Sequence, residues 1–171
     1  MTKLHRKSEN IIINSGIPYT FLRPNFLMQN FSETGTIKKS NSISILSDKG
    51  KISFIDVRDV AAVAAEALTK EDHYGKAYDL TGAEALSVDQ IVDIFSRMLG
   101  RQIIATKFSE SEARKLLIAA GFSDWYLDIL PEIAEAQEKG FMSIISNDVE
   151  KVIGRKPISF ANFVKDYINI F

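Results

Sequence analysis

The chain has 171 residues, of which 46% are hydrophobic and 25% are charged, and its formal net charge is −1. This length and composition predict one soluble globular domain, or a little more, and the balanced charge gives no reason to expect nucleic acid or an anionic membrane as a partner. The lack of cysteine excludes disulfides, a thiol nucleophile and thiolate metal sites, and it is compatible with a cytoplasmic location.

The first predicted element is a helix over residues 3–15 that carries Leu4, Ile11 and Ile12 on one stripe and ends at Gly16. Its polar residues do not resemble a signal peptide, and no apolar run in the chain is long enough to cross a bilayer. Residues 18–22 then predict a short buried strand. We expect Pro24 to stop this strand, because proline lacks an N–H group. An abrupt stop of this kind is typical of a ligand crevice at the carboxyl edge of an α/β sheet.

The middle of the chain continues with a helical turn around residues 26–31 and a polar, irregular stretch over 33–50 that contains a short alternation at 43–45. Residues 52–55 predict another strand. Asp56 is expected to cap the helix that follows, since a carboxylate can accept hydrogen bonds from the first N–H groups. The predicted buried face of this helix carries Val57, Val60, Ala61, Ala64 and Leu68.

The later part of the chain alternates in the same way. Residues 76–80 predict a strand, and Ser87 is expected to cap a helix over 88–99 that ends at Gly100. Residues 103–106 are a candidate edge strand. Further helices are predicted over 110–120, 124–138, 147–153 and 160–168. Strands that alternate with helices predict an α/β fold with a helical C-terminal cluster.

A search of the sequence for catalytic and ligand-binding motifs is mostly negative. No two glycines are closer than Gly75 and Gly82, so neither a Gly-x-Gly-x-x-Gly dinucleotide turn nor a phosphate-binding P-loop is present. His5 and His73 lie far apart and near no carboxylate cluster with ligand spacing, so we expect no metal site. The residues by themselves predict an α/β domain with a crevice and leave its activity open.

Six segments, in order along the chain, resemble the NmrA-like group of atypical short-chain dehydrogenases: residues 5–9, 15–26, 54–61, 78–82, 99–101 and 154–160. The resemblance spans nearly the whole chain but only the C-terminal half to three-fifths of a family member, without the glycine-rich turn. It implies the C-terminal part of a Rossmann-like parallel sheet with a mostly helical substrate-side subdomain. Residues 1–82 would be a remnant of the NAD(P)-binding domain and 83–171 the helical subdomain, the two being intertwined.

The resemblance also implies roles for individual residues. His5 and Glu9 stand where typical short-chain dehydrogenases have the Tyr and Lys of a Tyr-x-x-x-Lys motif, so His5 is a candidate catalytic residue and Glu9 a candidate cofactor neighbour. At i and i+4 they share a helix face. A histidine exchanges protons near neutral pH, whereas a carboxylate would repel a cofactor phosphate. The alternative is that both are solvated helix residues.

Two further groups would lie in the site of a family member. Pro24, Asn25 and Phe26 would correspond to the loop beside the nicotinamide ring. The adjoining substrate pocket would be formed by Met28, Asn30, Phe31 and Trp125. The alternative for these side chains is core packing, since aromatic residues and methionine at helical spacing are usually buried.

The family resemblance implies the substrate-side half of an NAD(P)H-dependent oxidoreductase that acts on a quinone or a similar small carbonyl compound. Alternatives are a non-catalytic NAD(P)-sensing regulatory protein and a nucleoside-diphosphate-sugar epimerase-like protein, although the latter needs a tyrosine base. Without a glycine-rich turn, we expect a fragment or a shortened gene product with weak or absent NAD(P)H binding, inactive alone. Its exposed sheet edge would be completed by another chain or by self-association.

Overall fold

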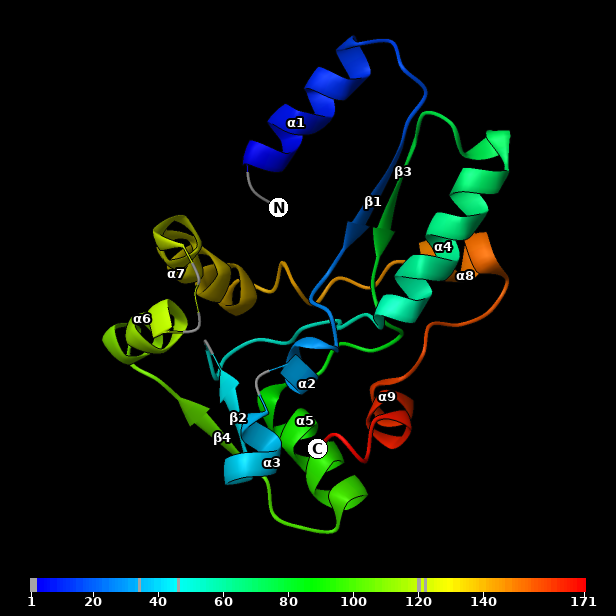
Figure 1. The fold of residues 1–171 in the computed structure, drawn as a ribbon. Coiled ribbons are helices and arrows are strands. Elements are labelled where there is room, and N and C mark those ends of the chain that lie inside the picture. Colours follow the sequence, from blue (N-terminus) through cyan, green and yellow to red (C-terminus); the bar gives the residue numbers. More distant parts are fainter. Residues whose placement is uncertain (1–2, 34, 46, 120, 122) are drawn as a thin grey trace.

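The structure is a computed structural model that describes residues 3–33, 35–45, 47–119, 121 and 123–171 (Figure 1). The strands are β1 (Thr20–Pro24), β2 (Ser42–Ile45), β3 (Lys76–Leu80) and β4 (Ile104–Lys107). The helices are α1 (Lys3–Asn14), α2 (Asn30–Glu33), α3 (Thr36–Ser40), α4 (Val57–Thr69), α5 (Val88–Leu99), α6 (Glu110–Ala119), α7 (Asp124–Glu138), α8 (Asp148–Ile153) and α9 (Phe160–Asp166), with a short 3-10 turn, η1 (Glu71–His73).

The strands form two parallel pairs. β1 pairs with β3, from Thr20 opposite Lys76 to Pro24 opposite Leu80. β2 pairs with β4, from Ser42 opposite Ile104 onward. Parallel strands require crossover connections, and the segments between the paired strands contain helices, as Figure 1 shows. The arrangement confirms the predicted α/β class.

β1 ends at Pro24, as the sequence predicts, and Pro24 is itself the last paired residue, opposite Leu80. The backbone N–H of Asn25 donates to Leu80 O at 2.9 Å, which continues the ladder with β3. Because successive residues of a strand point their N–H groups to opposite edges, the missing N–H of Pro24 belongs to the other edge of β1. In the described part of the chain that edge faces no strand, so proline costs no ladder hydrogen bond there.

The predicted strand over residues 52–55 is wrong. This segment makes only isolated bridges, between Ile52 and Leu86 and between Ile55 and Leu27. Its backbone instead bonds to several separate segments. Ile55 N donates to Phe26 O at 2.9 Å, and Ser53 N donates to Met142 O at 2.9 Å. The residues are buried and apolar enough for a strand, but no single neighbour runs beside them.

Helix α4 begins as predicted, with the Asp56 side chain accepting from Arg58 N, but it buries a different face. The buried residues are Asp59, Val63 and Ala67, whereas Val57 is 40% and Leu68 is 87% exposed. Asp59 explains the rotation. Its carboxylate accepts from Ile158 N at 2.7 Å and pairs with Arg155 at 2.7 Å. The inward-facing carboxylate thus gives a hydrogen-bond acceptor to a backbone N–H of the segment between α8 and α9.

The hydrophobic core has two parts. The larger cluster joins Phe54 to α5 and α9 through Phe95, Phe160 and Phe163, and the smaller one joins Ile55, Val63, Leu80 and Val149. Helix α1 belongs to neither, since none of its residues is buried, and it stands apart from the other helices in Figure 1. Leu4 and Ile11, predicted to form its inner stripe, are 54% and 62% exposed.

Candidate functional site

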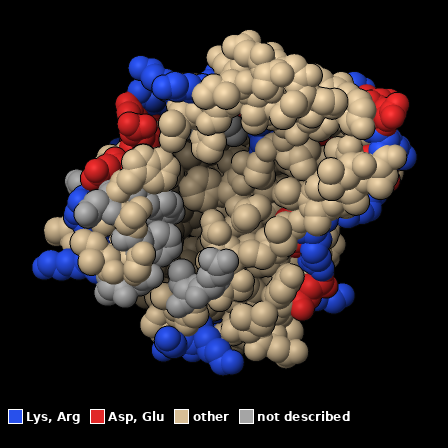
Figure 2. All heavy atoms as spheres, turned by 45° about the horizontal axis from the view of Figure 1, so that its top comes forward, with Lys and Arg blue, Asp and Glu red and all other residues tan. Residues whose placement is uncertain are grey.

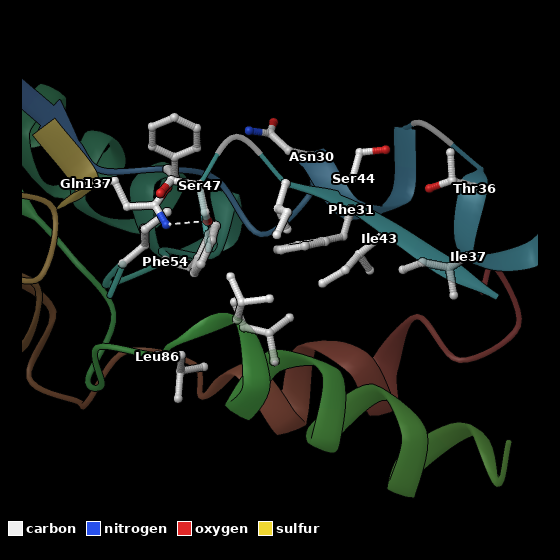
Figure 3. Close-up of a pocket in the computed structure, with 15 residues that line it drawn as sticks. Asn30, Phe31, Thr36, Ile37, Ile43, Ser44, Ser47, Phe54, Leu86 and Gln137 are labelled. Carbon is white, nitrogen blue, oxygen red and sulfur yellow. Dashed lines mark hydrogen bonds between the residues drawn. The ribbon is translucent and has the colours of Figure 1, made fainter. Parts of the chain in front are cut away.

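A cavity of about 200 Å³ lies between the segment after β1, strand β2 and the start of α5 (Figure 3). Figure 3 shows Phe31, Ile37 and Ile43 on one side of it and the first turns of α5 on the other. The lining residues are Phe26, Asn30, Phe31, Thr36, Ile37, Ile43, Ser44, Ile45, Ser47, Ile52, Phe54, Leu86, Val88, Ile91 and Gln137. Most of these side chains are apolar, so the cavity suits an apolar group of small size.

The aromatic wall of the cavity is held in place by ring contacts. The centroid of the Phe31 ring lies 5.2 Å from that of Phe54, 5.5 Å from Phe95 and 5.4 Å from Phe160. Such edge and tilted contacts are favourable at these separations. The Phe31 ring is therefore packed against Phe95 of α5 and Phe160 of α9.

The Pro24–Phe26 turn reaches this cavity through Phe26. The side chain of Asn25 is fully engaged within the protein. Its Nδ2 donates to Ser53 Oγ at 2.8 Å and to Met142 O at 2.9 Å, and its Oδ1 accepts from Phe26 N at 2.9 Å. Asn25 thus fixes the turn at the carboxyl end of β1, and Phe26 is placed against the cavity by that turn.

His5 and Glu9 lie on α1, and neither lines the cavity. The His5 side chain is exposed. Glu9 accepts two hydrogen bonds from Arg23 of β1, each at 2.8 Å. These hydrogen bonds and the Arg23 charge hold the pKa of Glu9 below its usual value. Because its carboxylate is engaged in this way, Glu9 links α1 to β1.

The remaining predicted pocket residues separate into two groups. Asn30 and Phe31 line the cavity together with Phe26. Met28 is 1% exposed and packs in the larger core cluster, and Trp125 on α7 is 57% exposed and lies outside the cavity lining. Ile37, Ile43 and Gln137 line the cavity but are not singled out by the sequence. The alternation over residues 43–45 is the one signal that marks part of this wall.

The surface around the hollow of the molecule carries few charges. Figure 2 shows a face that is hollowed near its centre, where most atoms belong to uncharged residues, while lysine, arginine and acidic side chains lie mainly around the periphery. Among the described residues, no group of three or more histidine, cysteine or acidic side chains could hold a metal ion. No helix in the same part of the chain is long and apolar enough to cross a membrane.

A model of the NmrA-like family matches residues 6–160. Among curated relatives, an NAD(P)H azoreductase from Xenophilus azovorans is 30% identical over 166 residues, which are 96% of this chain and 58% of that protein. An agroclavine dehydrogenase from Claviceps fusiformis is 34% identical over 161 residues, 91% of this chain and 56% of that protein.

Solved structures show the same likeness. An NADPH-dependent quinone oxidoreductase from Escherichia coli superposes with a TM-score of 0.82 at 26% identity, covering 96% of this chain and 60% of that one. A triphenylmethane reductase from Citrobacter gives a TM-score of 0.78 at 28% identity, with 96% and 58% covered. The chain thus spans somewhat more than half the length of the relatives that it matches.

Proposed function

The chain belongs to the NmrA-like family, and from this membership we propose that it is the substrate-side portion of an NAD(P)H-dependent oxidoreductase for a quinone or a similar small carbonyl compound. The observation that carries the proposal is the apolar cavity of about 200 Å³, walled by Phe31 and Phe54 and reached by Phe26 from the turn after β1. Relatives named as an azoreductase and a quinone oxidoreductase support a flat, conjugated substrate.

The residues of this chain are suited to the nicotinamide end of the dinucleotide but not to its pyrophosphate. The Pro24–Phe26 turn lies at the carboxyl end of a parallel strand, where such folds receive the nicotinamide. The chain has no glycine-rich turn to approach the pyrophosphate, since its nearest glycines are seven positions apart, at Gly75 and Gly82. When bound, NAD(P)H supplies a hydride. Phe26 and Phe31 would hold the substrate, and His5 is the proposed proton donor.

We propose that a second polypeptide segment completes the phosphate side and that the isolated chain binds NAD(P)H weakly or not at all. Three features support this. Within the described residues β1 has an open edge, α1 has no buried residue, and an apolar groove lies beside β1 between Tyr19 and Leu68. An unpaired edge with apolar surface beside it is a template for another strand. Self-association is the second way to cover it, and the cytoplasm is the proposed compartment.

The test compares the chain alone with a chimera. In the chimera, the portion of the Xenophilus azoreductase that this chain does not match is fused before Lys3. Calorimetric titration with NADPH is expected to show binding for the chimera and none in the low micromolar range for the chain alone. Low-micromolar binding by the isolated chain would contradict the need for completion.

Turnover separates the oxidoreductase from the alternatives. The chimera is expected to oxidise NADPH when a panel of quinones is added, and a His5→Ala variant should be slower. Lys7→Ala, an exposed neighbour on the same helix, is the matched control and should keep its rate. Intact NADPH binding with no turnover would favour an NAD(P)-sensing protein. The epimerase-like alternative has less support, because two matching structures named as epimerases are 19% and 14% identical and show the fold alone.

A further inference from the structure

We infer that Gln137 makes the cavity selective for a ligand that carries a hydrogen-bond donor, such as an aromatic carbonyl compound bearing a hydroxyl or amino group. The inference rests on the proposed function, because it narrows the substrate class of the same cavity. Gln137 belongs to α7 and lines the cavity. It is hydrogen-bonded to Ser47 and Lys49, which precede it in the chain by 90 and 88 positions.

The Gln137 side chain has a defined orientation. The residue is 4% exposed, and its Nε2 donates to Ser47 O at 3.0 Å and to Lys49 O at 2.9 Å. Both amide protons are therefore in use. A flipped amide would place its oxygen against two carbonyl oxygens, which are acceptors only, so the network allows one arrangement. Figure 3 shows this amide at one end of the cavity, with its nitrogen turned toward Ser47.

The oxygen of the same amide is left as an acceptor. In the described part of the chain, no donor bonds to Gln137 Oε1. Of the labelled lining residues beside Gln137 in Figure 3, Phe54 has no side-chain donor, and the Ser47 hydroxyl already donates to Glu138 Oε1. Gln137 lines the cavity and this oxygen is an acceptor that no described donor uses, so an O–H or N–H of a ligand in the cavity can bond to it.

The support beneath Gln137 is rigid. Ser47 Oγ donates to Glu138 Oε1 at 2.6 Å and accepts from Lys49 N at 3.2 Å. Gly50 adopts a φ of +75°, and a Cβ at this position would collide with the backbone oxygen of Gln137. The loop over residues 47–50 is thus closely fitted to α7. Because the Gln137 side chain is already held in one orientation, a ligand that bonds to it does not pay the entropy cost of immobilising that side chain.

A matched pair of small aromatic probes tests the inference on the chain as it is. Indole and benzofuran have nearly the same shape, but only indole has an N–H donor. We expect calorimetry or NMR titration to show that indole binds about threefold to tenfold more tightly, the range of one neutral hydrogen bond. In Gln137→Met the ratio should fall to near one. Gln102→Met, the same substitution at an exposed glutamine outside the cavity lining, should keep the ratio of the wild type.

A second readout does not depend on the variant folding. In the wild type, the side-chain amide resonance of Gln137 should shift on addition of indole and less on addition of benzofuran. Equal affinities for the two probes, or a ratio that persists in folded Gln137→Met, would overturn the role of Gln137 and leave the cavity as a ligand site. If neither probe bound, the inference and the cavity's assignment as a ligand site would both be wrong.

Discussion

The buried carboxylate of Asp56 holds the start of α4 and, through Gln29, the segment that forms the cavity wall. Asp56 has no exposed side-chain surface and accepts from Arg58 N at 2.9 Å, from Arg58 Nη2 at 2.8 Å and from Gln29 Nε2 at 3.0 Å. Gln29 in turn accepts from Val57 N at 3.0 Å. Burial alone would raise the pKa of Asp56, but the hydrogen bonds and the charge of Arg58 outweigh it and hold the pKa below its usual value.

This lowered pKa makes stability depend on pH in a known direction. An unfolded aspartate has a pKa of about 3.9, so on acidification the unfolded chain takes up the proton before the folded one does. The contribution of Asp56 is complete above that pH and is lost as the pH falls through the folded value. In Asp56→Asn, the deficit in unfolding free energy relative to the wild type should therefore shrink between pH 7 and pH 3. Urea unfolding at several pH values measures it.

The control for this prediction is Ser87→Ala, which removes the capping-box hydrogen bond of α5 but no titrating group. Its deficit should be about 1 kcal/mol at every pH in the series. A deficit of Asp56→Asn that stayed constant with pH would show that the carboxylate's charge does not contribute to stability.

At the scale of elements, the segment over residues 52–55 connects parts of the fold that lie far apart in the chain. Its backbone bonds to Phe26 O, Leu86 O and Met142 O, and Gly82 N donates to Ser53 O. The same segment places the Phe54 ring in the cavity wall. Gly82 allows the close approach, since a Cβ on it would collide with the carbonyl oxygen of Phe54.

Substitution of Gly82 tests this connection. Gly82→Ala should lower the unfolding free energy by about 3 kcal/mol, the upper range for overpacking, because the colliding atom belongs to the backbone and has little room to move. Gly75→Ala is the matched control. Its φ of +72° strains an alanine, but nothing lies within 4 Å of the added Cβ, so the cost should be nearer 1 kcal/mol. Urea unfolding of both variants measures the difference. Equal losses would mean that residues 53–55 shift easily.

At the scale of the whole molecule, the chain is unevenly packed. Aromatic contacts among Phe31, Phe95, Phe160 and Phe163 concentrate burial around α5 and α9. At the other end of the molecule, α1 is joined to β1 by the Glu9–Arg23 pair and carries exposed Leu4, Ile11 and Ile13. A helix with no buried apolar face gains little from tertiary packing, and short helices are marginal by themselves in water.

Amide hydrogen exchange should show this unevenness. In the isolated chain, we expect the amides of α1 to exchange orders of magnitude faster than those of α5, because local opening of α1 exposes almost no buried surface. In the azoreductase chimera described above, the amides of α1 should become protected. Protection of α1 equal to that of α5 in the isolated chain would argue against the proposed completion by a second segment.

The features that the sequence predicts well are those with local causes. The caps at Asp56 and Ser87 and the left-handed end at Gly100 are confirmed, since each depends on a few neighbouring residues. The predicted helix over residues 88–99 is also confirmed, and it buries Val88, Ile91, Ile94 and Phe95. Family membership is predicted from the order of short segments, and the family model that matches residues 6–160 confirms it. The roles of His5, Glu9 and the Pro24–Phe26 turn, and the division at residue 82, stay predictions.

What only the tertiary structure decides depends on partners that lie far away in the chain. The buried face of α4 follows from the bond between Asp59 and Ile158, and Asn25 is engaged by Met142. Gln137 enters the cavity because its amide bonds to Ser47 and Lys49. No local pattern encodes such pairings. Periodicity shows which residues of an element are apolar, but the satisfaction of buried polar groups decides which face turns inward, and it requires both partners to be in place.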